Sequence, residues 1–415
     1  MTVRTLAAQE RARGNWFFLF TFIFACFLFW WLPSILFRLV VHRSDAVEDQ
    51  AVAASVLALC LFTAGYLLPV TTVSRFRFST VTIDACGDFA FKASVLLFVP
   101  ALIMAIVLLR SRTGITYGMG DPIPRPFQAV FYTHLFFGFM YLGAADPVRQ
   151  GRRRMVAVVL LLTLPRLLES LHGGRFFLSQ AVVPAILIAT ARGWIRFSLK
   201  RMLQFAALAL VIVFLPPLTR GDDVIGQDET VKFFAAGSSL LLFQNNEDLN
   251  LSGRCPPLLV SLTAKTIPYG WLGLCVIDFS GLKNMPATLS RILTVNDPAS
   301  FEGTVSGTGS NYMLELELAG GLPAVYAGSA LFGFICRRFV GWIGMRSLFS
   351  GIWAECMTRA LFAPRGDLGY VFERIPSLVL TTLLVVFAVW AWRLLETELS
   401  VPITASSLTS GGTSE

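Results

Sequence analysis

Charged residues are scarce in this sequence: Asp, Glu, Lys and Arg together make up 14% of its 415 residues. A water-soluble globular protein carries roughly 25% charged residues, so this composition excludes that class. Disorder is excluded as well, because 55% of the residues are hydrophobic and the mean hydropathy is +0.66. Apolar runs recur along the whole length, which also excludes a soluble domain on one membrane anchor. The composition predicts an all-α polytopic membrane protein in which residues 1–415 form a single integral membrane domain.

Residues that hold metals or form redox pairs are few. The only three histidines, His42, His134 and His172, are too scattered for a zinc motif. The seven cysteines form no Cys-x-x-Cys pair; Cys255 and Cys275 share a loop and would form a disulfide only if it faces an oxidising compartment. No Gly-x-Gly-x-x-Gly or Walker sequence is present, so nothing indicates use of a cytoplasmic nucleotide. We therefore expect no cofactor and no metal.

Lysine is scarce too: of the 34 basic residues only five are Lys, which leaves 29 Arg. Arg is the better bidentate ligand for phosphate, and it is costly near a bilayer unless it has a role there. The plain alternative is codon bias in a GC-rich genome together with ordinary cytoplasmic loops. Nucleic acid is not an expected partner, because the charges are dispersed among apolar runs rather than striped along one domain.

Ten apolar runs are candidates for membrane spans, each of which takes about 20 residues. Arg clusters alternate between these runs, and the positive-inside rule places the clusters in the cytoplasm together with both termini. Residues 219–311 then form one large extracytoplasmic loop, and residues 402–415 form a flexible cytoplasmic tail. Asp84 and Asp88 fall on the cytoplasmic side, where a helix cap or a solvated face is expected. The predicted spans are 15–41, 51–73, 93–110, 126–144, 154–171, 175–191, 201–218, 312–336, 340–362 and 370–394.

A further set of arginines lies on the predicted outer face, where the positive-inside rule does not require them. Basic groups that converge at one membrane face form an anion site, and phosphate is the obvious anion near a lipid headgroup. Arg166 and Arg365 stand out, because each follows a Pro and has a nearby acid, Glu169 or Asp367, to fix its orientation. Ordinary interfacial snorkelling explains any single member equally well. The set comprises Arg166, Arg175, Arg220, Arg254, Arg291, Arg359 and Arg365.

A Gly/Ser-rich loop enters the predicted span at 312–336 in the sequence GTGSNYMLELELAGGLPAVYAG, residues 307–328. Asn311 and Glu315 lie one helical turn apart on the same side of this helix. A helix N-terminus entered from the outer face offers backbone N–H groups and a positive dipole to an anion. The alternative is an ordinary Ser/Asn cap with Glu in the first turns, and spacing alone favours this alternative.

This layout resembles the bacterial polysaccharide repeat-unit polymerases, the Wzy-type O-antigen polymerases, over most of the chain. The shared features are ten or so spans, a large periplasmic loop in the second half, and the stretch GSNYMLELELAGGL that opens the next span. The outer GGR and PRGD sequences also resemble the Arg-bearing periplasmic turns of that family. The related O-antigen ligases carry His-Asn, nine residues and then Gly at this junction. Here Asn311 and Gly321 match, but Ser310 stands where the ligases have His, which favours a polymerase.

The resemblance implies a GT-C-like helical bundle in the bacterial inner membrane that joins undecaprenyl-pyrophosphate-linked oligosaccharides in the periplasmic leaflet. It implies an inverting, metal-independent transfer. A sugar hydroxyl of an incoming repeat unit attacks the anomeric carbon of the growing chain, and undecaprenyl pyrophosphate leaves. Arg groups in a partly dry site would stabilise the charge on this leaving group. Besides the lipid bilayer, a chain-length regulator protein is an expected partner.

The expected site residues follow from the outer arginines and the resemblance together. We expect a catalytic role for Arg166, Arg365, Glu169 and Asp367, and substrate binding by Arg175, Arg291, Ser310, Asn311, Tyr312 and Glu315. The general base stays open among Glu169, Glu315 and Asp367.

Two rival functions stay open. One is a glycan ligase that uses the same lipid-linked donor with a different acceptor. The other is a lipid-linked oligosaccharide flippase or polysaccharide exporter, which would also use Arg residues in the membrane. A flippase should place charge along a central cavity and show internal repeats, and the sequence shows no such repeat.

Overall fold

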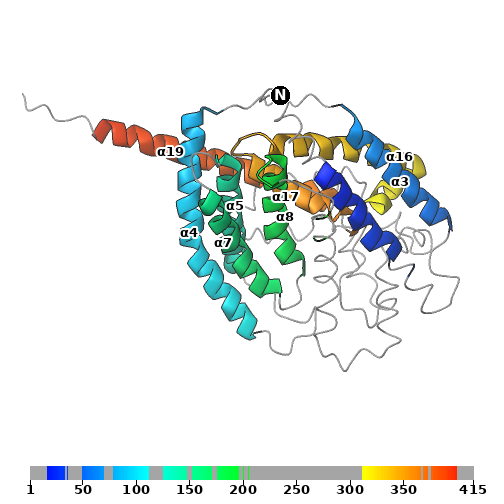
Figure 1. The fold of residues 1–415 in the computed structure, drawn as a ribbon, viewed down its shortest axis with the longest axis horizontal. Helices are drawn as coiled ribbons and strands as arrows, with labels where there is room; N and C mark the ends of the chain where they lie inside the picture. The colour runs from blue at the N-terminus through cyan, green and yellow to red at the C-terminus, as the bar shows by residue number, and fades with distance from the viewer. Residues whose placement is uncertain are drawn as a thin grey trace, which may run out of the picture.

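The computed structural model describes residues 16–32, 35, 49–69, 78–111, 125–146, 152–170, 175–195, 200, 204, 311–365, 368–372 and 375–399. Within these ranges every regular element is a helix, which confirms the all-α prediction for this part of the chain (Figure 1). The predicted loop at 219–311, apart from Asn311, the tail at 402–415 and the predicted span at 201–218, apart from Gln204, lie outside the described residues.

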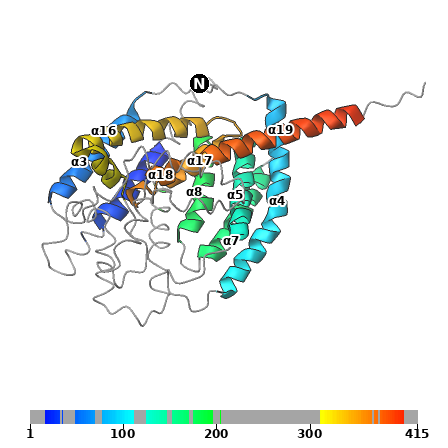
Figure 2. The same cartoon turned by 180° about the vertical axis from the view of Figure 1, so that it is seen from behind.

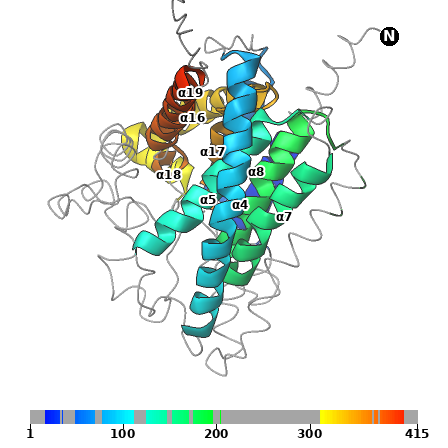
Figure 3. The same cartoon turned by 90° about the vertical axis from the view of Figure 1, so that its left-hand side faces the viewer.

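Four helices form one group in which neighbours pack side by side (Figures 1 and 3). They are α4 (Thr80–Ser111), α5 (Arg125–Ala144), α7 (Arg152–Ser170) and α8 (Arg175–Ala191). They correspond to the predicted spans at 93–110, 126–144, 154–171 and 175–191, except that α4 begins much earlier. Ser79 caps the N-terminus of α4, since its hydroxyl oxygen accepts the N–H of Thr82 at 3.1 Å. The apolar run stops at the charged residues of this segment, whereas the helix continues through them to its cap.

A second group consists of the helix at Trp16–Trp31, α3 (Asp49–Leu67) and α16 (Tyr312–Ile343). Aromatic rings fill the space between these helices. Phe22 stacks on Phe62 with ring centroids 3.9 Å apart, and Phe332 meets Phe62 edge-on at 5.6 Å. The first helix ends in a π-helical turn at Phe27–Trp31. An aromatic core thus joins helices that are far apart in the sequence.

Glycines allow α3 and α16 to approach each other very closely. A Cβ atom added at Gly333 would lie 2.0 Å from the carbonyl oxygen of Phe62, and one at Gly65 would lie 2.0 Å from that of Ala330. Both distances are too short for a side chain. Small residues that let two helix backbones touch are a common means of helix association in membranes.

We expect Gly333→Ala to lower the unfolding free energy of the detergent-solubilised protein by about 1–3 kcal/mol, because the added methyl group overpacks the contact. Helix propensity alone predicts the opposite sign, since Ala is favoured over Gly inside a helix by about 1 kcal/mol. Thermal melting checks this, with Ala327→Leu at an exposed position of α16 as the control. A melting temperature for Gly333→Ala at or above that of the unchanged protein would contradict the close contact.

α16 breaks in the middle at a pair of glycines. Gly320 and Gly321 leave the helical conformation, and Pro323 follows them. Gly321 has a φ of +68°, which L side chains rarely adopt. The break divides α16 into a short arm, residues 312–319, and a long arm, residues 322–343.

The two arms of α16 fold back on each other. In a straight helix, Tyr312 and Ser329 would be about 25 Å apart, at 1.5 Å per residue. Their hydroxyl oxygens are instead 3.5 Å apart. The side chain of Leu316 also packs against Gly328. The start of the predicted span at 312–336 is therefore a short arm that lies along the long arm, rather than the outer end of a straight helix.

The predicted span at 340–362 does not form as one helix. The long arm of α16 continues to Ile343, and after a turn the chain enters α17 (Ser350–Ala360), which has 11 residues. At 1.5 Å per residue α17 is about 17 Å long, too short to cross a bilayer. It packs against α5, α8 and α16, and so joins the two groups. The chain then passes through η4 (Ala363–Arg365) and α18 (Leu368–Phe372) to α19 (Ile375–Leu399).

Four described helices are long and apolar enough to cross a membrane: Asp49–Leu67, Thr80–Val107, Tyr312–Ile343 and Leu378–Glu396. α19 crosses α4, and its C-terminal half projects beyond the rest of the drawn helices (Figure 2). Both helices expose large apolar side chains, for example Leu96 on α4 and Phe387 on α19. Such surfaces are compatible with a lipid environment and with the prediction of a membrane protein.

Candidate functional site

Two buried hydrogen bonds hold the backbone of Pro364, which follows α17, and of Leu368, which begins α18. The indole N–H of Trp30 donates to the carbonyl oxygen of Pro364 at 2.9 Å. The backbone N–H of Leu368 donates to the carboxylate of Glu315 at 2.6 Å. Residues 364–368, here called the PRGDL segment, carry the predicted catalytic residues Arg365 and Asp367 between these two bonds. Helices distant in the sequence therefore hold the ends of the segment.

Glu315 and Trp30 are themselves well placed to hold this segment. Glu315 lies in the short arm of α16 and is 6% exposed, while Trp30 is fully buried. Tyr312 links them, because it lies one turn before Glu315 and its ring centroid is 5.8 Å from that of Trp30. The fold-back of α16 brings Tyr312 and Glu315 into the core beside Trp30.

Asn311 caps the short arm of α16. Its side-chain oxygen accepts the N–H of Met313 at 2.9 Å, and the residue is fully buried. The structure thus confirms the capping role that spacing alone favours. Tyr312 is fully buried against Trp30 and Phe332. An anion contact of Asn311 or Tyr312 stays a prediction.

Arg359 is a buried arginine in the last turn of α17. It is 2% exposed, and its guanidinium lies 3.4 Å from the carboxylate of Glu355, one turn earlier. A positive charge at a helix C-terminus is stabilised by the helix dipole. Arg359 stands five residues before Pro364, so α17 leads from a buried charge directly into the PRGDL segment. The sequence places Arg359 in the outer set of arginines, but no pattern singles it out.

Arg166 is equally buried but lies in the other group of helices. It belongs to α7, is 2% exposed, and has its guanidinium carbon 5.4 Å from the ring centroid of Tyr132 on α5. This distance is that of a cation–π contact. The contact with α5 does not by itself bring Arg166 to the PRGDL segment, so the predicted convergence of Arg166 and Arg365 stays a prediction.

The other predicted site residues are described only in part. The backbones of Glu169, Arg175 and Arg365 belong to α7, α8 and η4, while their side chains lie outside the description. Arg291, Ser310 and Asp367 lie outside the described residues, as do Cys255 and Cys275. In the part of the chain that the structure describes, no three His, Cys, Asp or Glu side chains gather into a group that could hold a metal ion.

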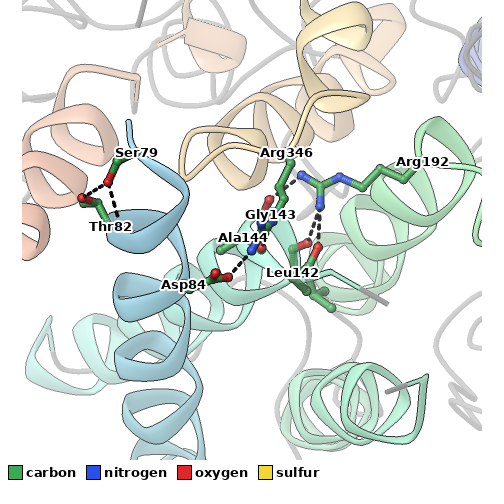
Figure 4. A network of polar contacts seen from close by, with 9 residues as sticks. Ser79, Thr82, Asp84, Leu142, Gly143, Ala144, Arg192 and Arg346 are labelled. Carbon is green, nitrogen blue, oxygen red and sulfur yellow. Dashed lines mark hydrogen bonds and ion pairs between the residues drawn. The ribbon is translucent and has the colours of Figure 1, made fainter. Parts of the chain in front are cut away.

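Two arginines, Arg192 and Arg346, donate hydrogen bonds to the carbonyl groups at the C-terminus of α5 (Figure 4). Arg192, just after α8, donates to the carbonyl oxygens of Leu142, Gly143 and Ala145. Arg346 donates to that of Ala144 at 2.8 Å. The last carbonyl groups of a helix have no partner within it, and these two side chains provide one.

The same two arginines tie α5 to the other helices. Arg192 also donates to the carbonyl oxygen of Met345 at 2.8 Å and to the hydroxyl of Ser350 at 3.3 Å. Arg346 forms an ion pair with Asp84 of α4. The ends of α5, α8 and α16 and the starts of α4 and α17 therefore meet. The alternation of Arg clusters predicts these ends on one face; its assignment to the cytoplasm stays a prediction.

Burial and the nearby charge of Arg346 lower the pKa of Arg192 to about 9, against the opposing effect of Asp146. The guanidinium therefore stays protonated at neutral pH, where it complements the negative end of the α5 dipole.

We expect Arg192→Ala to destabilise the protein by about 1–3 kcal/mol, because buried carbonyl groups lose their donor. Arg192→Lys should recover only part of this loss, since an ammonium group has three donors and no planar fork. The check is the melting temperature in detergent, with the exposed Lys200→Ala as the control. Equal melting temperatures for Arg192→Ala and Lys200→Ala would show that this network contributes nothing to stability.

Comparison with known proteins gives no assignment: no protein-family model, no curated protein and no solved structure matches the chain.

Proposed function

We propose that this protein is a polymerase that joins undecaprenyl-pyrophosphate-linked oligosaccharide repeat units into a surface polysaccharide at the periplasmic face of the bacterial inner membrane. The observation that carries the proposal is the burial of Arg166 and Arg359, each 2% exposed, in a helical protein of apolar composition. Burial of an arginine in such a protein costs free energy, and a buried arginine there indicates a functional site by default.

The proposed reaction needs positive charge near its leaving group. The hydroxyl oxygen of the incoming repeat unit forms a bond to the anomeric carbon of the growing chain, while the bond from that carbon to the pyrophosphate oxygen breaks. The hydroxyl proton passes to a base, and the negative charge of undecaprenyl pyrophosphate increases as it leaves. Guanidinium groups in a dry site stabilise this charge more strongly in the transition state than in the ground state.

The site residues have different proposed roles. Arg166 and Arg365 are proposed to bind the pyrophosphate, and Arg359 joins them because of its burial and its place before the PRGDL segment. Glu169 and Asp367 are the proposed acids beside the first two arginines. Glu315 is proposed to hold this segment rather than to act as the general base, because its carboxylate accepts the N–H of Leu368.

Deletion of the gene in its bacterial host tests this function. Electrophoresis of the surface glycan should then show a single repeat unit on its final carrier and no ladder of longer chains, and a plasmid copy of the gene should restore the ladder. Loss of the single-unit product as well would favour a glycan ligase, or a flippase that delivers the lipid-linked units. An unchanged ladder would exclude both enzymes.

A further inference from the structure

We propose that Glu315 and Trp30 are positioning residues, which hold the PRGDL segment in place from both of its ends. The proposal rests on the proposed function as far as catalysis is concerned, because the segment matters through Arg365 and Asp367. The contacts themselves stand independently of that function.

The positions of the two hydrogen bonds carry the proposal. One holds the carbonyl group of Pro364, the residue directly before Arg365. The other holds the N–H of Leu368, the residue directly after Asp367. Both bonds therefore act on the backbone next to the two predicted catalytic side chains. The first joins residues 334 positions apart and the second 53, so the two ends of the segment, Pro364 and Leu368, are tied to two separate helices.

The bonds are strong because of their surroundings. Trp30 has no exposed surface and Glu315 is 6% exposed, so water competes little for either group. The bond from Leu368 to Glu315 is 2.6 Å long, and its acceptor is a carboxylate, which makes such bonds shorter and stronger than neutral ones. The fold-back at Gly320 and Gly321 in turn holds Glu315 in the core.

Positioning and general-base catalysis by Glu315 predict different results for one substitution. Gln keeps an oxygen that accepts the N–H of Leu368, but it cannot take up a proton at neutral pH. If Glu315 positions the segment, Glu315→Gln should keep kcat within about threefold, whereas Glu315→Ala should lower it about 10²-fold with little change in KM. If Glu315 is the base, both variants should fail alike.

Trp30→Phe tests the other end of the segment. Phe keeps an aromatic ring beside Tyr312 but has no N–H to donate to Pro364. We expect a fall in kcat similar in kind to that of Glu315→Ala, at equal protein abundance in the membrane. Rates are measured with lipid-linked repeat units extracted from the deletion host, and Glu396→Ala, an exposed carboxylate of α19, is the control.

A measurement without activity separates this proposal from the proposed function. Hydrogen–deuterium exchange of the full-length protein in nanodiscs, followed on peptides that contain Leu368, reports directly on the bond to Glu315. Exchange should speed up at least about tenfold in Glu315→Ala, stay near that of the unchanged protein in Glu315→Gln, and not respond to Glu396→Ala.

Each combination of exchange and activity results supports or overturns the positioning proposal. Unchanged exchange in Glu315→Ala would overturn the positioning proposal, whatever the activity. Faster exchange together with loss of kcat in Glu315→Ala and its recovery in Glu315→Gln would support it. If the unchanged protein extends no glycan, the proposed function fails, and exchange alone then decides whether the contacts hold the segment. Equal loss of kcat in Glu315→Ala and Glu315→Gln would overturn the positioning role and return Glu315 to the list of bases.

Discussion

Replacing Arg359 by Ala should abolish the ladder of long glycan chains while the protein remains in the membrane at its normal level. Removal of one charged donor from a catalytic site costs about 10²–10³-fold in rate, or about 3–4 kcal/mol, which is enough to erase a ladder that needs many consecutive transfers. Arg359→Lys should recover only a small part, because an ammonium group cannot bind a pyrophosphate through the two parallel bonds of a guanidinium. The measurement is the length distribution of the surface glycan in the complemented deletion strain.

The ion pair with Glu355 supplies the control for this prediction. If Arg359 serves only to neutralise Glu355, then Glu355→Gln should make Arg359 dispensable, and the double substitution should be active. If Arg359 binds the leaving group, Glu355→Gln alone should retain the ladder and the double substitution should lose it. Since the two groups are 3.4 Å apart and Glu355 is itself partly buried, protein abundance must be compared in all of these strains.

The sequence predicts the helices of the first group well and their ends less well. Hydropathy locates α5, α7 and α8 to within a few residues, because these helices bury or expose apolar faces along their whole length. It misses the start of α4, because Asp84 and Lys92 interrupt the apolar run without interrupting the helix. Asp84 is tolerated there because Arg346, far away in the sequence, pairs with it.

The segment after α16 shows why a continuous apolar run need not be a span. Residues 340–362 have the composition of a membrane helix, yet a turn divides them between α16 and α17. Arg192 stabilises this turn through the carbonyl oxygen of Met345 and the hydroxyl of Ser350. A contact between residues more than 150 positions apart leaves no local signal. By contrast, the fold-back of α16 has a local signal in Gly320, Gly321 and Pro323, which hydropathy does not register.

In the candidate site, too, some contacts follow from the local sequence and others depend on tertiary packing. The cap at Asn311 follows from local sequence, because it involves residues two positions apart. The burial of Arg359 and the bond from Trp30 to Pro364 depend on tertiary packing, so a single sequence gives no means to find them. The acceptor role of Glu315 has the same origin, and it changes the interpretation of a residue that local spacing presents as a substrate ligand or a base.

Two of the arginines of α7, when substituted, distinguish a functional role from that of an ordinary arginine at the membrane border. Arg166 is 2% exposed beside Tyr132, whereas Arg153 is exposed in the first turn of the same helix. We expect Arg166→Ala to remove the ladder by the same 10²–10³-fold loss, about 3–4 kcal/mol, that applies to Arg359. Arg153→Ala should be nearly silent, because Arg152 and Arg154 still provide the positive charge that predicts this end of the helix on the cytoplasmic side.

Arg166→Met decides whether any loss reflects chemistry or folding. Methionine has a long, flexible apolar side chain that fits beside the ring of Tyr132, and replacing a buried charge by a well-packed apolar group is often neutral or stabilising. A structural arginine would therefore be replaced by Met without loss of the ladder. If Arg166 is catalytic, the Arg166→Met protein should be at least as stable in detergent as the unchanged protein but should form no long glycan chains. A full ladder in Arg166→Met would place the anion site elsewhere, with Arg359 and Arg365 as its remaining members and the PRGDL segment as its centre.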